Sequence, residues 1–184
     1  MKIIPQRDGH FILEPLFCKE PGGQLTLPSA MTQKRLSGAK DYASRSNPRR
    51  SFRELVLAKA KKYQGTPYSL GASLEYSRAT DCSAFVQYIY QGFEIDLPRC
   101  SRDQAQVGKT VTQNLDFSRL LPGDLLFFRR HGQRIGHAGI YMGEGKMIHA
   151  FNRRKGVVVS DLSQPYYLNT FVVAKRVFEV RYPN

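Results

Sequence analysis

Apolar residues recur at helical spacing in two stretches of the middle of the chain. Ser51 followed by Glu54 forms a capping-box pattern, and the positions after it predict a helix over residues 51–63. A second helix is predicted over residues 82–91, ending at Gly92, because glycine is typical of helix C-caps. Its aromatic and aliphatic residues fall on neighbouring faces, so we expect this helix to be buried.

After residue 121 the pattern changes to that of strands. Pro122-Gly123-Asp124 is a turn signal, and short apolar runs follow it, separated by Gly, Asn and Pro. The predicted strands are 125–128, 137–142, 146–151, 156–160 and 171–180. Helices first and strands afterwards predict an α+β fold with a mostly antiparallel sheet.

One predicted hairpin carries two histidines. Gly143-Glu144-Gly145 separates its strands, and His137 and His149 lie six residues before and six residues after Gly143. In a hairpin centred on Gly143 these histidines would be direct cross-strand neighbours.

The first 50 residues differ from the rest of the chain. Five prolines and the pair Gly22-Gly23 interrupt any regular period there. We therefore predict an N-terminal extension over residues 1–50 and a folded domain over residues 51–184. Phe11-Ile12-Leu13 is a short apolar segment that could lie against the domain as an extended arm.

The composition is that of a folded, strongly basic protein. Hydrophobic residues make up 41% and aromatic residues 11%, which excludes a wholly disordered chain. The net charge is +13, and residues 1–63 supply +8 of it, with 13 basic and 5 acidic side chains. Such an excess indicates an anionic partner, which could be nucleic acid, lipid headgroups or an acidic polymer, or simply a solvated basic arm. No recognised nucleic-acid-binding motif accompanies it, so we expect no specific nucleic-acid partner.

Three cysteines, Cys18, Cys82 and Cys100, are too few and too scattered for a disulfide framework or a structural zinc site. Cys18 and Cys100 could pair in an oxidising compartment or remain two free thiols. No stretch of about 18 apolar residues predicts a membrane span. The first eight residues lack the apolar segment of a signal peptide, so we expect either another export route or a processed chain.

Cys82 is the residue around which the candidate chemistry gathers. It stands at the predicted start of a helix, where the partial positive charge favours thiolate over thiol. A downstream imidazole can take the thiol proton, and a second polar group can orient that imidazole. His137 and His149 are suited to these two roles, although a single buried Cys or His is more often an ordinary core residue.

The chain resembles the NlpC/P60 cysteine peptidases, a family of the papain-like clan, over about residues 53–178. The matching segments are Gly65-Thr66-Pro67-Tyr68, Asp81-Cys82-Ser83-Ala84-Phe85-Val86, Leu97-Pro98-Arg99, Pro122-Gly123-Asp124-Leu125-Leu126-Phe127-Phe128, Gly136-His137-Ala138-Gly139-Ile140-Tyr141 and Met147-Ile148-His149-Ala150. The resemblance is greatest to the compact cell-wall endopeptidases of the family. It implies a papain-like α+β catalytic domain with the nucleophile at a helix N-terminus.

The resemblance also implies a role for several residues. Cys82 would be the nucleophile, His137 the general base and acid, and His149 the third polar residue of the triad. Tyr68 would place its hydroxyl near the nucleophile and stabilise the oxyanion. The residues that flank or face the thiol and would contact substrate are Asp81, Ser83 and Arg99. For Arg99, binding of a substrate carboxylate and capping of the local helix and loop are both open.

The implied substrate is a peptidoglycan stem peptide or cross-link, cut at bonds that involve D-glutamate and diaminopimelate. No metal or cofactor is expected. We expect a monomer in the periplasm or otherwise outside the bacterial cytoplasm, with the basic arm on an anionic wall polymer. The alternatives are an amidase, an acyltransferase or an antibacterial effector with the same triad, a basic module that binds nucleic acid or the cell wall, or an inactive wall-binding scaffold.

The chain departs from the family pattern at three places. Tyr68 is followed by Ser69-Leu70-Gly71-Ala72 instead of an aromatic residue and paired glycines. Cys100 separates Arg99 from Ser101, and residues 129–135 make a basic approach to His137. These changes affect the shape of the pocket and leave the predicted triad intact.

Overall fold

The computed structural model of the protein describes residues 2–5, 11–14 and 51–180. The described residues belong to two compact units. The larger unit is Arg53–Val177, and the smaller contains the described residues before and after it. The predicted division into an extension over 1–50 and a domain over 51–184 stays a prediction.

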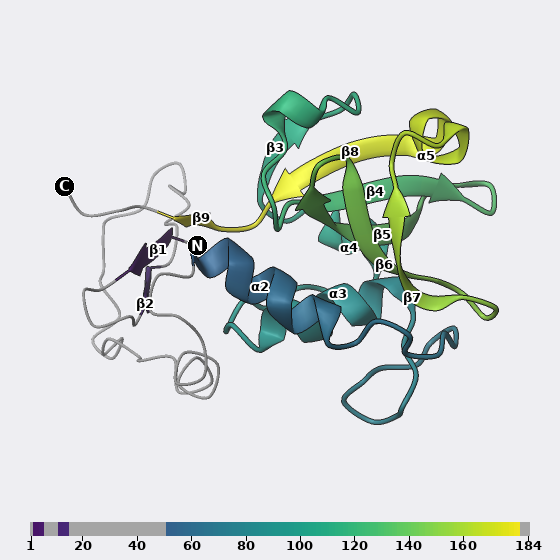
Figure 1. Cartoon of the computed structure of the whole chain (residues 1–184), viewed down its shortest axis with the longest axis horizontal. Helices are drawn as coiled ribbons and strands as arrows, with labels where there is room; N and C mark the ends of the chain where they lie inside the picture. The colour runs from purple at the N-terminus through teal and green to yellow at the C-terminus, as the bar shows by residue number, and fades with distance from the viewer. Residues whose placement is uncertain (1, 6–10, 15–50, 181–184) are drawn as a thin grey trace, which may run out of the picture. The chain divides into compact units, whose positions relative to one another are not determined.

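Both predicted helices are present in the structure. α2 spans Phe52–Lys61 and α3 spans Cys82–Gln91 (Figure 1). Three short helical segments were not predicted, because each has too few residues for a helical period to emerge. They are α4 (Ser101–Gln104), α5 (Pro165–Thr170) and the 3₁₀ turn η1 (Phe117–Arg119).

The larger unit contains a six-stranded sheet in the order β3-β8-β4-β5-β6-β7 (Figure 1). Its strands are β3 (Lys109–Thr112), β4 (Leu125–Arg130), β5 (Gln133–Gly143), β6 (Lys146–Asn152), β7 (Gly156–Asp161) and β8 (Phe171–Arg176). Every neighbouring pair is antiparallel. The predicted α+β class with a mostly antiparallel sheet is confirmed.

A second, three-stranded sheet lies in the smaller unit. It consists of β1 (Lys2–Pro5), β2 (Phe11–Glu14) and β9 (Glu179–Val180), in the order β2-β1-β9. The predicted strand over 171–180 is thus two strands, β8 and β9. β8 pairs with β3 and β4 in the six-stranded sheet, whereas β9 pairs with β1, and Val177 and Phe178 lie between the two strands.

The β5–β6 hairpin is centred one to two residues later than predicted. Its turn residues are Glu144 and Gly145, both with positive φ (53° and 67°), as a two-residue hairpin loop requires. The register pairs Ile140 with Ile148, so Gly139 rather than His137 comes opposite His149. The predicted direct pairing of the two histidines is therefore wrong, and they are diagonal neighbours.

Helix α3 is buried, as its sequence predicted. It packs on β5 and β6, and its buried residues are Cys82, Ser83, Ala84, Phe85, Val86, Ile89 and Tyr90. Full burial of an aromatic or aliphatic side chain such as Phe85 or Ile89 contributes about 1.5–3 kcal/mol. The Tyr90 hydroxyl also donates a hydrogen bond to the carbonyl of Gly123. The first residue of α3, Cys82, is therefore held on a rigid element.

The C-terminus of α3 depends on Lys59 of α2. The Lys59 ammonium donates to the carbonyls of Tyr88 (2.9 Å) and Ile89 (3.1 Å). Gly92 is the C-cap, as predicted, but with φ −66° it does not use the left-handed conformation. A Cβ at Gly92 would lie 1.8 Å from Lys59 Nζ, so glycine is needed there for the approach of the lysine. Burial lowers the pKa of Lys59 to about 8.

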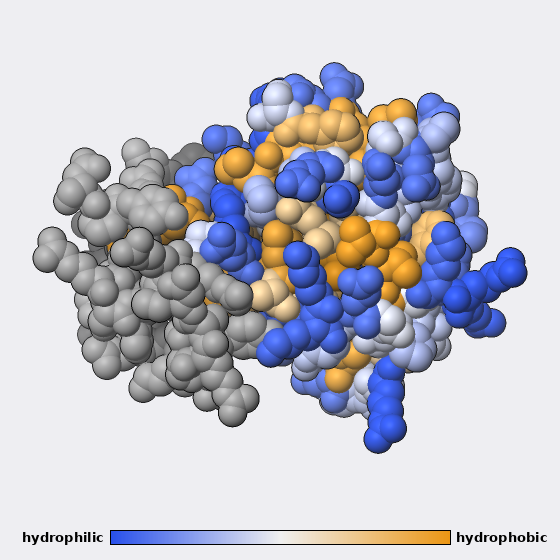
Figure 2. Space-filling model, viewed as in Figure 1, coloured by the Kyte–Doolittle hydropathy of each residue, from blue (hydrophilic) through white to orange (hydrophobic). Residues whose placement is uncertain are grey.

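The surface carries many hydrophilic side chains. On the face in Figure 2 they project around patches of apolar side chains. None of the helices in the described ranges has the length and apolar character needed to cross a bilayer.

Candidate active site

Cys82 is the first residue of α3. The Asp81 carboxylate caps this helix by accepting a hydrogen bond from the Ala84 N–H (2.8 Å). Cys82 is only 7% exposed, and burial raises the pKa of its thiol. The Ala138 N–H and the Arg130 cation act in the opposite direction, since both favour a thiolate. A buried, protonated thiol needs a base before it can act as a nucleophile.

His137 and His149 are fully buried and hydrogen-bonded to each other. His137 Nε2 lies 2.6 Å from His149 Nδ1, across strands β5 and β6. Gly139 makes this approach possible, because a Cβ there would lie 2.3 Å from Met147 Sδ and 3.0 Å from His149 Cβ. The structure thus brings the two predicted histidines together in spite of their offset register.

Burial sets the charge of both imidazoles. It lowers the pKa of His137 well below the ordinary value, and the neighbouring His149 and Arg130 lower it further. Burial also lowers the pKa of His149 to about 3, with smaller contributions from the cations Arg130 and Lys155. Both rings are therefore neutral at neutral pH, and each has one donor and one acceptor nitrogen.

Two hydroxyl groups hold the far side of His149. Its Nε2 lies 2.9 Å from Ser160 Oγ on β7 and 3.3 Å from the Tyr167 hydroxyl on α5. Neither residue was predicted. Val158 pairs with His149, and Ser160 lies on the same face two residues later, but this follows only once the β6–β7 register is known.

Arg130 makes the remaining hydrogen bond of His137. Its Nη1 lies 3.2 Å from His137 Nδ1, and because arginine has no acceptor, Nδ1 must be the acceptor. The proton of neutral His137 is then on Nε2, which donates to His149 Nδ1. His149 in turn carries its proton on Nε2 and donates to Ser160. One guanidinium therefore fixes the tautomers of both histidines.

The loop that carries Tyr68 is tied to the sheet and to the start of α3. The Ser69 N–H donates to the carbonyl of Thr80 (3.1 Å), and the Thr80 N–H donates to the carbonyl of Pro67 (3.0 Å). The Val157 N–H of β7 donates to the carbonyl of Thr66 (2.8 Å). Tyr68 is half-buried and lines the same cleft as Cys82. Burial raises the pKa of its hydroxyl, which stays protonated and can donate.

Asp81, Ser83 and Arg99 form one hydrogen-bonded network. Arg99 Nη2 and Nη1 donate to the two Asp81 carboxylate oxygens at 2.7 and 3.0 Å, and Nη1 lies 3.0 Å from Ser83 Oγ. Burial would raise the pKa of Asp81, but the hydrogen bonds from Arg99 and Ala84 outweigh it and lower the pKa. Arg99 is thus engaged by Asp81, which favours the local anchoring role over binding of a substrate carboxylate.

A cleft of about 820 Å³ opens in front of Cys82. It is lined by Tyr68, Leu70, Gly71, Asp81, Cys82, Ser83, Arg99, Cys100, Ser101, Arg102, Arg130, His131, Ile135, Gly136, Asn152, Arg153 and Arg154. Arginines contribute five of these residues, and Asp81 is the one carboxylate among them. Because Arg99 is paired with Asp81, the cleft has a net positive wall that suits an anionic substrate.

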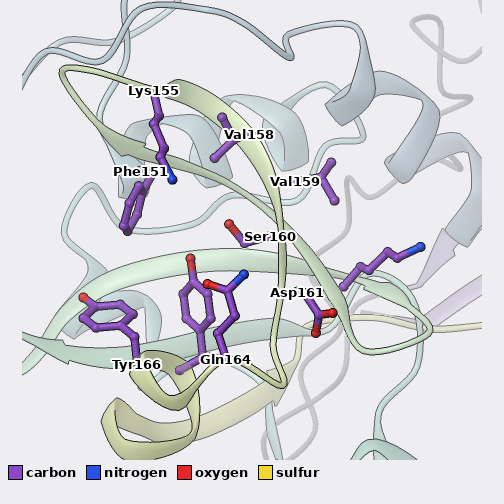
Figure 3. Close-up of a pocket in the computed structure, with 10 residues that line it drawn as sticks. Phe151, Lys155, Val158, Val159, Ser160, Asp161, Gln164 and Tyr166 are labelled. Carbon is purple, nitrogen blue, oxygen red and sulfur yellow. The ribbon is translucent and has the colours of Figure 1, made fainter.

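Figure 3 shows a second cavity, of about 520 Å³. Its wall includes Ser160 and Tyr167, the two partners of His149. Figure 3 shows Ser160 between the aromatic side chains of Phe151 and Tyr166 on one side and Asp161 on the other.

Of the other cysteines, Cys100 is a free, exposed thiol that lines the cleft, and Cys18 lies outside the described residues. Within the described ranges no three His, Cys, Asp or Glu side chains gather in a way that could hold a metal ion.

Comparison with known proteins places the chain in a family. The chain is 36% identical over 123 residues to the Escherichia coli murein DD-endopeptidase MepS/murein LD-carboxypeptidase, covering 66% of this chain and 61% of that protein. It is 37% identical over 128 residues to the γ-DL-glutamyl hydrolase of Bacillus subtilis, covering 67% of this chain and 30% of that protein. The matched region is therefore less than two thirds of the length of these relatives.

Solved structures agree with the sequence comparison. An NlpC/P60 family protein from Bacillus cereus superposes with a TM-score of 0.61 at 29% identity, covering 69% of this chain and 40% of that chain. The NlpC/P60 domain of the peptidoglycan hydrolase SagA superposes with a TM-score of 0.56 at 27% identity, covering 68% of this chain and 99% of that domain. The NlpC/P60 family itself matches residues 65–176, a range that contains Tyr68, Cys82, His137 and His149. The chain belongs to the NlpC/P60 family.

Proposed function

We propose that this protein is a cysteine endopeptidase that hydrolyses peptidoglycan stem peptides or cross-links. The observation that carries the proposal is that Cys82 begins a buried helix packed on β5 and β6, the strands that hold the bonded pair His137–His149, and that its thiol accepts a hydrogen bond from the N–H of Ala138, next to His137. Cys82 is the nucleophile, His137 the general base and acid, and His149 the residue that orients His137. The relatives named as murein endopeptidase and peptidoglycan hydrolase support this substrate class.

In the acylation step, His137 Nδ1 accepts the proton of the Cys82 thiol, because Nε2 is committed to His149. The thiolate attacks a peptide carbonyl, and the oxyanion is stabilised by the Cys82 backbone N–H and the Tyr68 hydroxyl. The first N–H groups of a helix have no intrahelical acceptor, so the Cys82 N–H is available for this purpose. His137 then protonates the leaving amine, and a thioester with Cys82 remains.

In the deacylation step, water takes the place of the departed amine. His137 removes a proton from this water, and the resulting hydroxide attacks the thioester carbonyl. The tetrahedral intermediate collapses with release of the Cys82 thiolate, which recovers its proton from His137. His149 stays neutral throughout and accepts a hydrogen bond from His137 Nε2, which stabilises the imidazolium form.

The cationic wall of the cleft supports an acidic peptide as substrate. Stem peptides carry free carboxylates, and the arginines of the cleft offer partners for them. A substrate in the cell wall implies that the protein acts outside the cytoplasm, in the periplasm or an equivalent compartment. The roles of Tyr68, Asp81 and Ser83 at the substrate are part of this proposal.

Digestion of purified diaminopimelate-type peptidoglycan tests the proposal. We expect new stem-peptide fragments, identified by mass, with the wild type and with the control Cys100→Ala, and none with Cys82→Ala. Fragments that persist with Cys82→Ala would refute the role of Cys82. An acyl group transferred to an amine instead of water would identify an acyltransferase, and release of ammonia without chain cleavage an amidase.

A further inference from the structure

Arg130 is hydrogen-bonded to Nδ1 of His137, the nitrogen through which the proposed base must act. It is the last residue of β4, and its Nη1 lies 3.2 Å from His137 Nδ1. Its guanidinium also lies 5.7 Å from the centre of the Phe151 ring, a distance typical of a cation–π contact. Arg130 is half-buried and lines the cleft that contains Cys82.

This contact takes the lone pair that the chemistry requires. His137 Nε2 is bonded to His149, so Nδ1 is the nitrogen that must receive the thiol proton. As long as Arg130 donates to Nδ1, that lone pair is occupied by a group that cannot give up its own proton. The arrangement in the structure is therefore a resting state, with Cys82 as a thiol and His137 as a neutral imidazole.

The bond between Arg130 and His137 is open to competition. A guanidinium binds a carboxylate in a bidentate, charge-assisted manner, which is stronger than its bond to a neutral imidazole. The cleft holds three further arginines with no carboxylate partner among its lining residues, namely Arg102, Arg153 and Arg154. A carboxylate is therefore attracted into the cleft that Arg130 lines.

We propose that Arg130 is a positioning residue that keeps His137 inactive until a carboxylate of the substrate binds its guanidinium and draws it off His137 Nδ1. The substrate class is then an acidic peptide with a free carboxylate near the scissile bond, as distinct from its amidated counterpart. This inference rests on the proposed function for the identity of the substrate, but not for the contact between Arg130 and His137.

Release of Nδ1 lets the thiol proton move from Cys82 Sγ to His137. A neutral pair becomes a thiolate–imidazolium pair, so no net charge is created and no further reactant is needed. The titratable and charged groups bonded to His137 are Arg130 from β4 and His149 from β6. The Cys82 thiol of α3 accepts a hydrogen bond from the N–H of the next residue, Ala138. Removal of the Arg130 cation favours the imidazolium, whereas it disfavours an isolated thiolate.

The rate of Cys82 alkylation by iodoacetamide separates these two effects, and it needs no substrate. We expect Arg130→Gln to raise the rate at neutral pH by about tenfold, which corresponds to a thiol pKa lower by one unit. Arg129→Gln is the matched control, since Arg129 is exposed, precedes Arg130 and does not line the cleft. An Arg130→Gln rate equal to or below that of the wild type would overturn the proposal, because Arg130 would then be a stabiliser of the thiolate.

A carboxylate probe tests release in the unmodified protein. N-acetyl-D-glutamate should accelerate alkylation of the wild type and leave Arg130→Gln unchanged, whereas its amide, N-acetyl-D-isoglutamine, should have little effect on either. The ¹⁵N shift of His137 Nδ1 should report an unprotonated, hydrogen-bonded nitrogen in the wild type that changes with the probe. A shift that N-acetyl-D-glutamate leaves unchanged would contradict the proposal without any variant.

Steady-state kinetics then connect the contact to specificity. The wild type should prefer a stem peptide with a free carboxylate over the amidated peptide, and Arg130→Gln should lose this preference through a higher KM for the free acid and a higher kcat for the amide. Equal effects on both peptides would indicate a merely structural residue. If neither peptide is cut but alkylation responds as expected, the proposed function fails while the role of Arg130 stands.

Discussion

At the scale of single residues, Ser160 fixes the orientation of the buried His149 ring. Its hydroxyl oxygen accepts a hydrogen bond from His149 Nε2 (N···O 2.9 Å), which keeps His149 Nδ1 as the acceptor for His137. We expect Ser160→Ala to lower kcat about tenfold with little change in KM, less than the 10²–10⁴-fold that general acid–base catalysis supplies. The Tyr167 hydroxyl remains near Nε2 and limits the loss.

Ser163→Ala is the matched control for this variant, because Ser163 is exposed and lies in the segment that follows β7. Its kcat should equal that of the wild type. A Ser160→Ala enzyme with unaltered kcat would contradict the orienting role of Ser160.

Arg99 is a second single residue with a testable role, which is to stabilise the folded protein through Asp81. Asp81 is 4% exposed and depends on Arg99 for two of its hydrogen bonds. Removal of Arg99 leaves a buried carboxylate without its cation. Because the Arg99 side chain is 39% exposed, we expect Arg99→Ala to lower the free energy of unfolding by about 2–3 kcal/mol, below the full penalty for a buried pair.

Chemical denaturation measures this difference, with Arg102→Ala as the control. Arg102 is exposed in the adjacent helix α4, so its loss should change stability by less than about 0.5 kcal/mol. Equal stabilities of the two variants would show that the pair with Asp81 contributes nothing.

At the scale of helices and strands, the sequence predicted those elements whose bounds depend on residues close together in the chain. The bounds of α3 follow from the Asp81 cap, the glycine at position 92 and an apolar face, and the strands of the histidine hairpin follow from alternation. Positions that depend on register could not be predicted. The pairing of His149 with Val158, which brings Ser160 to the histidine, is decided by contacts between strands.

The contact of Arg130 with His137 could not be predicted either, because it also depends on strand register. Phe128 pairs with His137, but the β4–β5 register shifts between Phe128 and Arg130, and this irregularity decides what the arginine contacts. A β-bulge leaves little trace in the pattern of apolar residues. The sequence could indicate a basic approach to His137 over 129–135, but not which arginine contacts the imidazole.

Lys59, which links α2 to the end of α3, should make the stability of the protein depend on pH. The folded-state pKa of Lys59 is about 8, below the value of about 10.4 of an unfolded lysine. Between these values the unfolded chain binds more protons, so the contribution of Lys59 to the free energy of unfolding rises with pH. Below pH 8 both states are protonated and this contribution is constant.

Denaturant titrations between pH 7 and pH 10.5 test this with Lys59→Met against the exposed neighbour Lys61→Met. The stability of the wild type relative to Lys59→Met should rise through the interval from about 8 to about 10.4. The stability relative to Lys61→Met should stay flat. A flat difference for Lys59→Met as well would show that its ammonium is not desolvated.

At the scale of the whole molecule, charge is the property most open to test. Six basic residues lie between positions 34 and 50, namely Lys34, Arg35, Lys40, Arg45, Arg49 and Arg50, and their replacement by Gln lowers the net charge from +13 to +7. We expect the affinity for an anionic wall polymer to fall about tenfold at low salt, with a smaller loss at high salt because ions screen the attraction. Sedimentation with purified walls measures it.

Cleavage of a short soluble stem peptide by the same variant is the control, since a small substrate does not need a second point of attachment. Its kcat/KM should be retained. If the variant sediments with walls as well as the wild type does at low salt, the basic segment does not bind the wall polymer and is only a solvated arm.

The most direct test of the whole account is the covalent intermediate on Cys82. A stem peptide should be mixed with the enzyme, quenched in acid within the first turnovers, and the protein digested and analysed by mass. We predict an acyl group of the mass of the N-terminal stem fragment on the peptide that contains Cys82, absent from Cys82→Ala and strongly diminished in His137→Ala. Hydrolysis that proceeds with Cys82 unmodified, or an acyl group on Cys100 instead, would contradict the account.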